Sequence, residues 1–207
     1  MQDEKLRRLQ RSLQVVNSPI DDEAIQGGVP ITVDVVGEGS GGLIGYRAKN
    51  YAGLIDVDKV REYEVLDYWD PVFRPRRGGL ILDPSDFYIL ASKEAVRVPP
   101  THAAEMVAYD TLVGEFRVHY AGFFDPGFGD PEAGGAGSRA VLEVRSYEVP
   151  FQIEQGQTVG RLTYERLIEP PRMLYGSGLK SSYQGQSITL SKHFKPLREF
   201  SLPWACP

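Results

Sequence analysis

Residues 80–90 read Leu80-Ile81-Leu82-Asp83-Pro84-Ser85-Asp86-Phe87-Tyr88-Ile89-Leu90. Two apolar runs flank an Asp-Pro-Ser-Asp tetrapeptide in this stretch. Proline presets its own φ, and aspartate side chains bond to nearby backbone groups, so the tetrapeptide is typical of a tight turn. The stretch therefore predicts a β-hairpin in the middle of the chain.

The segments on either side of this hairpin also have the composition of short strands. β-Branched and aromatic residues recur between turn signals, which favours extended structure. We predict strands over residues 31–36, 43–49, 61–66, 94–98, 116–124, 140–147, 149–153 and 158–167. About ten short strands at this spacing favour an all-β sandwich or a distorted barrel. The 22 glycines and 15 prolines argue against a helical bundle, because these are the two poorest helix formers.

One amphipathic helix is predicted at the N-terminus. Its apolar residues recur at helical spacing within residues 3–16, and the pattern stops before Asn17-Ser18-Pro19. We therefore expect a helical appendage over residues 1–20, one β domain over 21–192 and a C-terminal tail over 193–207. Within the β domain, residues 130–138 are rich in Gly and Ala and predict a mobile surface loop.

Charge and composition limit the partners of the chain. The formal net charge is −5 and the pI is near 5.3, which gives no overall attraction to nucleic acid or to an anionic membrane. No apolar run is long enough for a transmembrane helix, and the N-terminus lacks the apolar core of a signal peptide. We expect a cytoplasmic protein without nucleic-acid or membrane partners.

The single cysteine, Cys206, limits the chemistry. One thiol cannot form an intramolecular disulfide, which suits a reducing compartment. A zinc deaminase needs a His or Cys together with a Cys-x-x-Cys pair, and this chain cannot supply them. We therefore expect no zinc and no protein-bound metal.

Six segments, in this order along the chain, together resemble one family. They are residues 31–36, 82–99, the Ala121–Gly129 stretch with its Asp-Pro-Gly-Phe turn, 141–144, the Gly-Gln-x-x-Gly-x-Leu-x-x-Glu stretch over 156–167, and Tyr175 with Tyr183-Gln184-Gly185-Gln186. This order resembles the dCTP deaminase/dUTPase superfamily, and most closely the C-terminal half of the long bacterial 2′-deoxycytidine 5′-triphosphate deaminases.

The resemblance implies a dUTPase-like, β-clip fold that is mainly β, with the N-terminal helix added. It implies a hydrolase of nucleotide metabolism that converts dCTP to dUTP and ammonia and so supplies dUTP. It also implies a homotrimer with sites at subunit interfaces, and Mg²⁺ that arrives with the nucleotide triphosphate.

Glu143 is the main catalytic candidate. Alternation along a strand places Ala140, Leu142 and Val144 on one face and Glu143 on the other. A carboxylate that simply faces solvent is the alternative that this pattern leaves open. The resemblance implies that Glu143 activates a water molecule for attack on C4 of cytosine and later protonates the leaving ammonia, which is general acid–base chemistry.

Two further segments are nucleotide-binding candidates by the same resemblance. Asp125-Pro126-Gly127-Phe128 suits a type II turn, and it is either only a tight turn or part of the pyrimidine and sugar pocket. The resemblance implies nucleotide contacts from Ala121, Gly122, Asp125 and Phe128. In the tail, it implies contacts from Tyr175, Lys180, Tyr183 and Gln186, where a disordered terminus is the alternative.

The phosphate-binding loop departs from the family pattern. Single-domain relatives carry an Arg/Lys-Ser-Ser motif before the Asp-Pro-Gly turn, whereas this chain has Asp110, Thr111 and Glu115 in that stretch. Thr111 could replace one hydroxyl, and Arg117 and His119 are candidate cations or orienting groups. One interpretation is that an N-terminal half of a longer chain, or a second chain, supplies the Lys-Ser-Ser loop.

Two other functions stay open at this point. A dUTP diphosphohydrolase would use an aspartate near the sugar, and Asp125 is its candidate. A non-catalytic half of a dCTP deaminase, used for trimerisation or regulation, would explain the altered loop at Asp110-Thr111.

Overall fold

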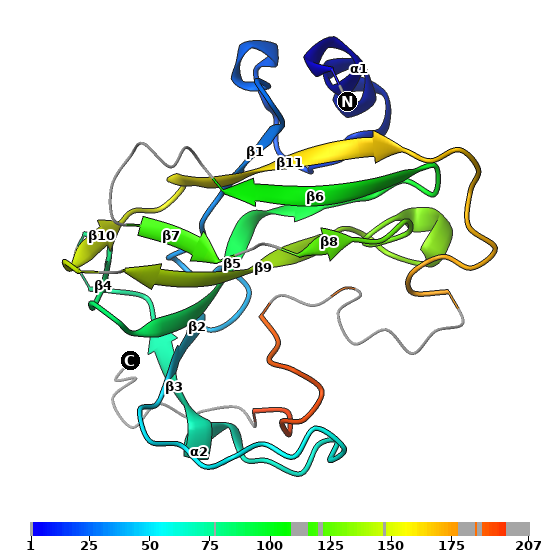
Figure 1. Ribbon diagram of the computed structural model, residues 1–207. Helices are drawn as coiled ribbons and strands as arrows, with labels where there is room; N and C mark the ends of the chain where they lie inside the picture. The colour runs from blue at the N-terminus through cyan, green and yellow to red at the C-terminus, as the bar shows by residue number, and fades with distance from the viewer. Residues whose placement is uncertain are drawn as a thin grey trace.

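The computed structural model describes residues 2–76, 78–108, 116–119, 122–146, 148–177, 185 and 188–197, and of residues 108 and 116–119 it describes the backbone alone. The elements are, in chain order, α1 (Asp3–Leu13), η1 (Asp22–Ala24), β1 (Val29–Thr32), β2 (Leu43–Ala48), α2 (Val65–Tyr68), β3 (Trp69–Phe73), β4 (Leu80–Leu82), β5 (Phe87–Val96), β6 (His102–Ala108), β7 (Phe116–His119), β8 (Phe123–Phe124), η2 (Pro131–Ala133), β9 (Ser138–Ser146), β10 (Phe151–Ile153) and β11 (Thr158–Arg166). The chain is therefore mainly β with an N-terminal helix, as predicted (Figure 1).

Two open sheets and one small strand pair form the fold. The larger sheets have the strand orders β3-β2-β5-β9-β7 and β1-β11-β6-β8, and β10 pairs with β4. Apolar side chains from both larger sheets belong to one buried cluster, for example Leu90 and Leu142 from the first and Ile31 and Leu162 from the second. Within the described residues neither sheet closes into a barrel, so of the two predicted architectures the sandwich-like one describes the chain.

Strand β9 has the alternation that the sequence predicts. Ala140, Leu142 and Val144 are fully buried, while Glu143 and Arg145 are exposed. Because successive side chains of a strand point to opposite faces, the core fixes the direction of Glu143 through its neighbours. We call the face of the five-stranded sheet that carries Glu143 its outer face.

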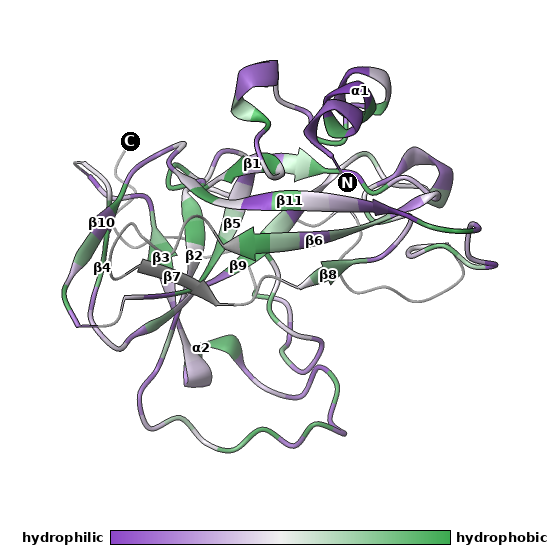
Figure 2. Ribbon diagram, turned by 45° about the horizontal axis from the view of Figure 1, so that its top comes forward, coloured by the Kyte–Doolittle hydropathy of each residue, from purple (hydrophilic) through white to green (hydrophobic). Residues whose placement is uncertain are grey.

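Helix α1 packs against the β structure through one apolar stripe. Leu6 and Leu9 are buried in the main core, whereas most of the helix surface is hydrophilic (Figure 2). The helix ends at Leu13, three residues before the predicted end, because Gln14 takes a left-handed conformation and its N–H bonds to the carbonyl oxygen of Gln10.

The predicted hairpin at residues 80–90 is wrong, although both of its strands exist. Strand β4 pairs with β10, and β5 pairs with β2 and β9. The turn residues bond to another part of the chain, since the N–H of Ser85 donates to the carbonyl oxygen of Ser146 at 3.0 Å. Asp83-Pro84-Ser85-Asp86 is therefore a corner at which the chain changes sheets. The predicted strand over 94–98 is the end of the long strand β5.

Three other predictions of local structure need correction. Residues 61–66 form no strand, since Tyr63 makes an isolated bridge to Phe194 and α2 begins at Val65. The predicted strand over 116–124 is split between β7 and β8, which lie in different sheets. The predicted mobile loop over 130–138 contains η2, where the Asp130 side chain accepts a hydrogen bond from the N–H of Glu132.

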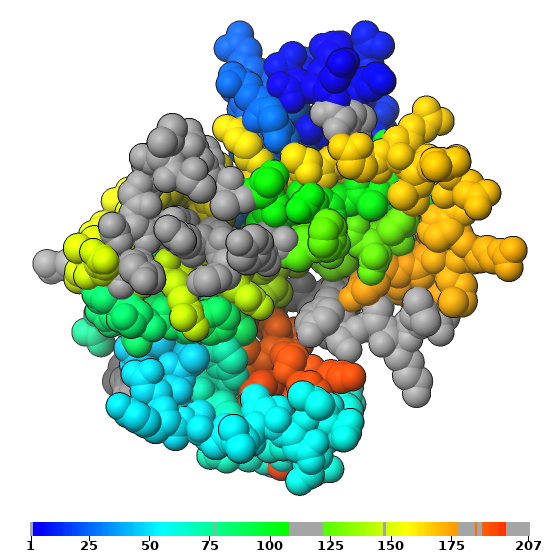
Figure 3. Space-filling model, in the orientation of Figure 1, coloured from blue at the N-terminus to red at the C-terminus, as the bar shows by residue number. Residues whose placement is uncertain are grey.

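A second apolar cluster covers part of the outer face. It consists of Tyr46, Val65, Leu190 and Phe194, and partly buried side chains that include Ile89 pack against it. Residues 188–197 (red) lie against the loop around residues 50–68 (cyan) in the space-filling view (Figure 3). Backbone hydrogen bonds join the two segments, for example from the N–H of Lys195 to the carbonyl oxygen of Tyr63 at 2.9 Å. The apolar cluster ends at Ile89, one strand away from Glu143.

Candidate active site

Glu143 lies on the outer face of β9 with its side chain exposed. Strand register places Ile89 of β5 opposite it on one side and His119 of β7 opposite it on the other. Among the residues whose side chains the structure describes, none forms an ion pair or hydrogen bond with the Glu143 carboxylate. The carboxylate is exposed, and its register neighbour Ile89 packs against the second apolar cluster.

The predicted cation candidates on β7 are placed by backbone register. His119 lies opposite Glu143, and Arg117 lies opposite Arg145. In an antiparallel pair, residues that are directly opposite belong to the same cross-strand row. The register thus brings the three predicted positions 117, 119 and 143 into two adjacent rows of one sheet.

The Asp125–Phe128 segment forms the predicted type II turn. The N–H of Phe128 donates to the carbonyl oxygen of Asp125 at 3.0 Å, and Gly127 has φ +97°. That φ requires glycine, and a Cβ at Gly127 would also lie 2.8 Å from the Cβ of Leu174. The turn therefore sits tightly against the chain near residue 174, with the Asp125 side chain exposed.

Phe128 and Tyr175 contact each other. Phe128 is 7% exposed, and its ring centroid lies 5.7 Å from that of Tyr175 and 5.1 Å from that of Phe124. The N–H of Tyr175 donates to the carbonyl oxygen of Pro126 at 2.8 Å. Both side chains pack with the main core, so little of the Phe128 ring is left for a sugar, and its role in binding stays a prediction.

The structure describes the remaining predicted site residues only in part. Gly122 is exposed just before β8, and a Cβ there would meet nothing within 4 Å. Five predicted residues lie outside the described part of the chain, namely Thr111, Ala121, Lys180, Tyr183 and Gln186. For Arg117 and His119 only the backbone position is described.

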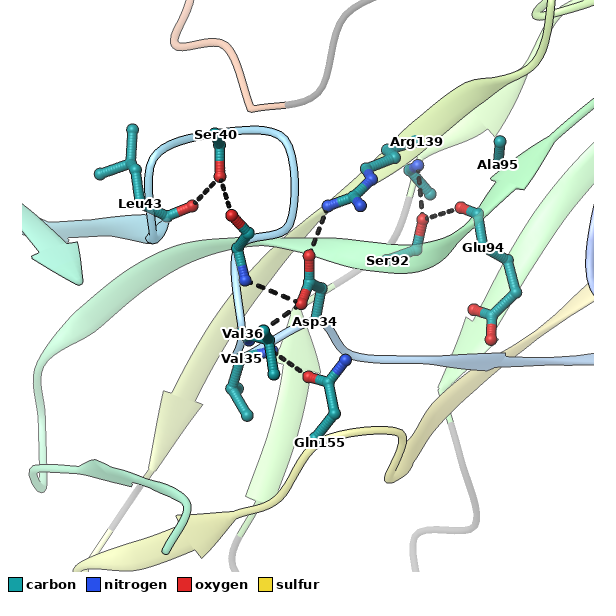
Figure 4. A network of polar contacts seen from close by, with 12 residues as sticks. Asp34, Val35, Val36, Ser40, Leu43, Ser92, Glu94, Ala95, Arg139 and Gln155 are labelled. Atoms are coloured by element: carbon teal, nitrogen blue, oxygen red, sulfur yellow. Dashed lines mark hydrogen bonds and ion pairs between the residues drawn. The ribbon is translucent and has the colours of Figure 1, made fainter. Parts of the chain in front are cut away.

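A buried polar network lies at the other end of β9. Arg139 Nη1 lies 2.5 Å from Oδ2 of Asp34, and the Asp34 carboxylate also accepts hydrogen bonds from the N–H groups of Val36 and Gly37 (Figure 4). Burial alone would raise the pKa of Asp34, but these hydrogen bonds and the Arg139 charge outweigh it and lower the pKa below its ordinary value. Sequence reasoning missed Arg139, since nothing in the local pattern links it to a residue 105 positions away.

A polar pocket of about 320 Å³ lies elsewhere on the molecule. It is lined by Arg47, Ala48, Lys49, Asn50, Asp70 and Asp86. Arg47 lies within 4 Å of Asp70, Asp83 and Asp86, and Lys49 lies 3.6 Å from Asp70. Because these cations already face carboxylates, the pocket offers a ligand little uncompensated charge.

The described residues show neither a metal-binding cluster nor a membrane-spanning helix. They contain no group of three or more His, Cys, Asp or Glu side chains that could hold a metal ion. None of their helices is long and apolar enough to cross a membrane.

Comparison with known proteins identifies the family. The family model described as "2′-deoxycytidine 5′-triphosphate deaminase (DCD), C-terminal domain" matches residues 2–194. The chain belongs to this family. The resemblance seen in the six sequence segments is thereby confirmed at the level of the family.

Relatives of the deaminase family match the chain over most of its length. A protein from Haloarcula marismortui named dCTP deaminase is 29% identical over 201 residues, which are 94% of each chain. A protein from Corynebacterium jeikeium named "dCTP deaminase, dUMP-forming" is 27% identical over 189 residues, 90% of this chain and 92% of the relative.

A solved structure of a deaminase from Agrobacterium tumefaciens has the same fold. The crystal structure of this 2′-deoxycytidine 5′-triphosphate deaminase matches with a TM-score of 0.73 and 51% identity, and the match covers 83% of this chain and 49% of the other. The chain thus spans about half the length of that structure.

Proposed function

We propose that this chain deaminates dCTP to dUTP and ammonia, with Glu143 as the group that moves the protons. The observation that carries the proposal is the position of Glu143 in a chain of the deaminase family. The carboxylate is exposed on the outer face of β9, lies opposite His119 by register and has no described partner.

The reaction needs one proton acceptor that becomes a proton donor. Glu143 takes a proton from a water molecule, whose oxygen bonds to C4 of cytosine. The carboxylic acid then gives that proton to the amino nitrogen, the C4–N bond breaks, and ammonia leaves. A single carboxylate can serve both steps because it returns to its starting state, and such a group contributes about 10²–10⁴-fold to the rate.

The remaining features of the proposal rest on the family resemblance. The nucleotide arrives as its Mg²⁺ complex, in which the phosphates supply most of the metal ligands. The Asp125–Phe128 turn and the tail from Tyr175 bind the base and sugar. We further propose a homotrimer in the cytoplasm, in which a neighbouring subunit, an N-terminal half or a second chain supplies the Lys-Ser-Ser loop that contacts the phosphates.

A product assay on the purified chain tests the proposal. With dCTP and Mg²⁺ we expect equal amounts of dUTP and ammonia. The Haloarcula marismortui relative serves as the positive control. If that relative converts dCTP and this chain leaves it intact, the chain is a non-catalytic member of the family and the proposal fails.

A second activity is favoured by one of the comparisons. The Corynebacterium jeikeium relative is named dUMP-forming, and this chain keeps the exposed Asp125 near the proposed sugar site. We therefore include diphosphohydrolysis of dUTP as the second candidate. In the same assay, pyrophosphate and dUMP in place of dUTP would assign it. Pyrophosphate release without ammonia would assign a dUTP diphosphohydrolase instead.

A further inference from the structure

We propose that Arg145 binds the phosphate chain of the nucleotide whose base lies at Glu143. This inference rests on the proposed function, because it takes Glu143 as the reacting end of the site. It assigns a phosphate-binding role to a residue for which neither the sequence motifs nor the comparisons gave one.

The first argument is position. Arg145 and Glu143 are two residues apart on β9, and both side chains are exposed on the outer face. Alternate residues of a strand point to the same face and lie about 7 Å apart. A nucleotide has dimensions of this order, so its base and its phosphates can face the two side chains at the same time.

The second argument is the way in which the guanidinium is held. The Arg145 Cζ atom lies 5.1 Å from the centroid of the Phe87 ring, which is a cation–π contact. Phe87 in turn packs against Trp69, and the centroids of the two rings are 6.1 Å apart. An arginine that stacks on an aromatic ring keeps the N–H donors in its own plane free for a second partner. The aromatic rings thus orient the cation without neutralising it.

The third argument is the lack of a compensating charge. In the described part of the chain, Arg145 forms no ion pair, whereas Arg47 and Arg139 both face carboxylates. Its register neighbour on β7 is Arg117, so no carboxylate lies directly opposite it on that strand. Phosphates are the anions that arginine binds with charge-assisted, bidentate hydrogen bonds.

Binding of inorganic tripolyphosphate tests the site without any chemistry. Calorimetry on the wild-type chain should show binding, and Arg145→Ala should weaken it at least about tenfold, as expected when charge-assisted hydrogen bonds are lost. Arg145→Lys should keep part of the affinity. The affinity of Phe87→Leu for tripolyphosphate should lie between those of Arg145→Ala and Arg145→Lys, because this change removes the ring that holds the guanidinium.

Arg172→Ala is the matched control, since Arg172 is an exposed arginine outside both sheets. It should bind tripolyphosphate like the wild type. Thermal unfolding of each variant identifies any general loss of structure. The inference is overturned if the wild-type chain does not bind tripolyphosphate, or if Arg145→Ala weakens binding no more than Arg172→Ala does.

Steady-state kinetics separates this inference from the proposed function. Arg145→Ala should raise KM for dCTP at least about tenfold and leave turnover of deoxycytidine, which has no phosphates, unchanged. If Arg145→Ala lowers the activity on dCTP and on deoxycytidine by the same factor, the phosphate-binding role is overturned. If the wild type binds tripolyphosphate through Arg145 and yet produces no ammonia from dCTP, the proposed function fails and the anion site stands.

Discussion

The two ends of strand β9 show opposite uses of charge. Near the start of the strand, Arg139 is 20% exposed at its side chain and pairs with Asp34, which is 4% exposed. Towards the end of the strand, Glu143 and Arg145 are exposed and have no ion-pair partner among the described residues. The same strand therefore carries one charged group that is paired within the fold and two that we propose to contact the nucleotide.

Physical chemistry explains why the two ends must differ. A buried charge loses its hydration, and it is tolerated only when partners and hydrogen bonds replace the lost water. Asp34 has such partners in two backbone N–H groups and in Arg139. An exposed carboxylate needs none, so its lack of a partner costs the fold little. The difference distinguishes a structural end of β9 from the end that carries the proposed functional groups, and mutations can test that division.

The largest expected effect is at the functional end. Glu143→Gln keeps the size of the side chain and removes the proton acceptor, so we expect kcat for dCTP deamination to fall about 10²–10⁴-fold. Ammonia release measures this effect, while the thermal midpoint should stay unchanged because the side chain is exposed. Glu105→Gln, at an exposed position of the other sheet, is the control and should retain full activity. Wild-type activity in Glu143→Gln would contradict the assignment.

The next effect is at the structural end. Asp34→Ala removes one partner of a buried ion pair and leaves the Arg139 charge uncompensated, which typically costs about 3–5 kcal/mol of folding free energy. Urea denaturation measures the change. The double variant Asp34→Ala with Arg139→Met should recover part of the loss, because it removes both charges. If the double variant loses the sum of the two single losses, the pair is not coupled and the comparison breaks down.

A smaller effect is expected at Ser92 of β5, which bonds to Ala140 near the start of β9. Its hydroxyl group donates to the carbonyl oxygen of Glu94 at 2.6 Å and accepts from the N–H of Ala140 at 2.9 Å. Ser92→Ala leaves both buried groups without that partner and should lower the folding free energy by about 1–3 kcal/mol. Ser177→Ala removes a hydroxyl group that bonds only at the surface, and it should have little effect in the same denaturation experiment.

The smallest effect is the pH dependence of the buried pair. The folded-state pKa of Asp34 is lowered below its ordinary value, so the unfolded chain binds the proton more tightly. The contribution of Asp34 to stability is thus complete above about pH 4 and is lost as the pH falls through the folded-state pKa. Thermal midpoints of the wild type and Asp34→Asn should converge in that acidic window. A constant gap between them down to the lowest pH would show that Asp34 is not responsible.

Local sequence was informative where the deciding interactions are short in range. The alternation in residues 140–145 predicted which face of β9 carries Glu143, since a strand has a period of two. Proline followed by glycine predicted the type II turn at Asp125–Phe128, because that turn needs a positive φ at its third position. The mainly β fold and the N-terminal helix followed from composition and periodicity in the same way.

Local sequence failed where weak propensity or distant pairing decides the structure. Strand β6 was not predicted because His102–Ala108 contains three alanines, which have low β propensity. Strand β3 contains Pro71, which disfavours a central strand, and it forms the edge of its sheet. The hairpin prediction paired β4 with its neighbour in sequence, whereas the partner β10 lies about seventy residues further along the chain.

The sequence by itself determined the mainly β class, the direction of Glu143 and the family, because each depends on composition, on periodicity or on the order of motifs. Only the tertiary structure decided which charges are neutralised. Asp34 and Arg139 meet across 105 residues, and Arg145 comes to lie on the ring of Phe87 through the pairing of β5 with β9. A one-dimensional pattern cannot show whether a charge has a partner, since that depends on which strands are neighbours in space.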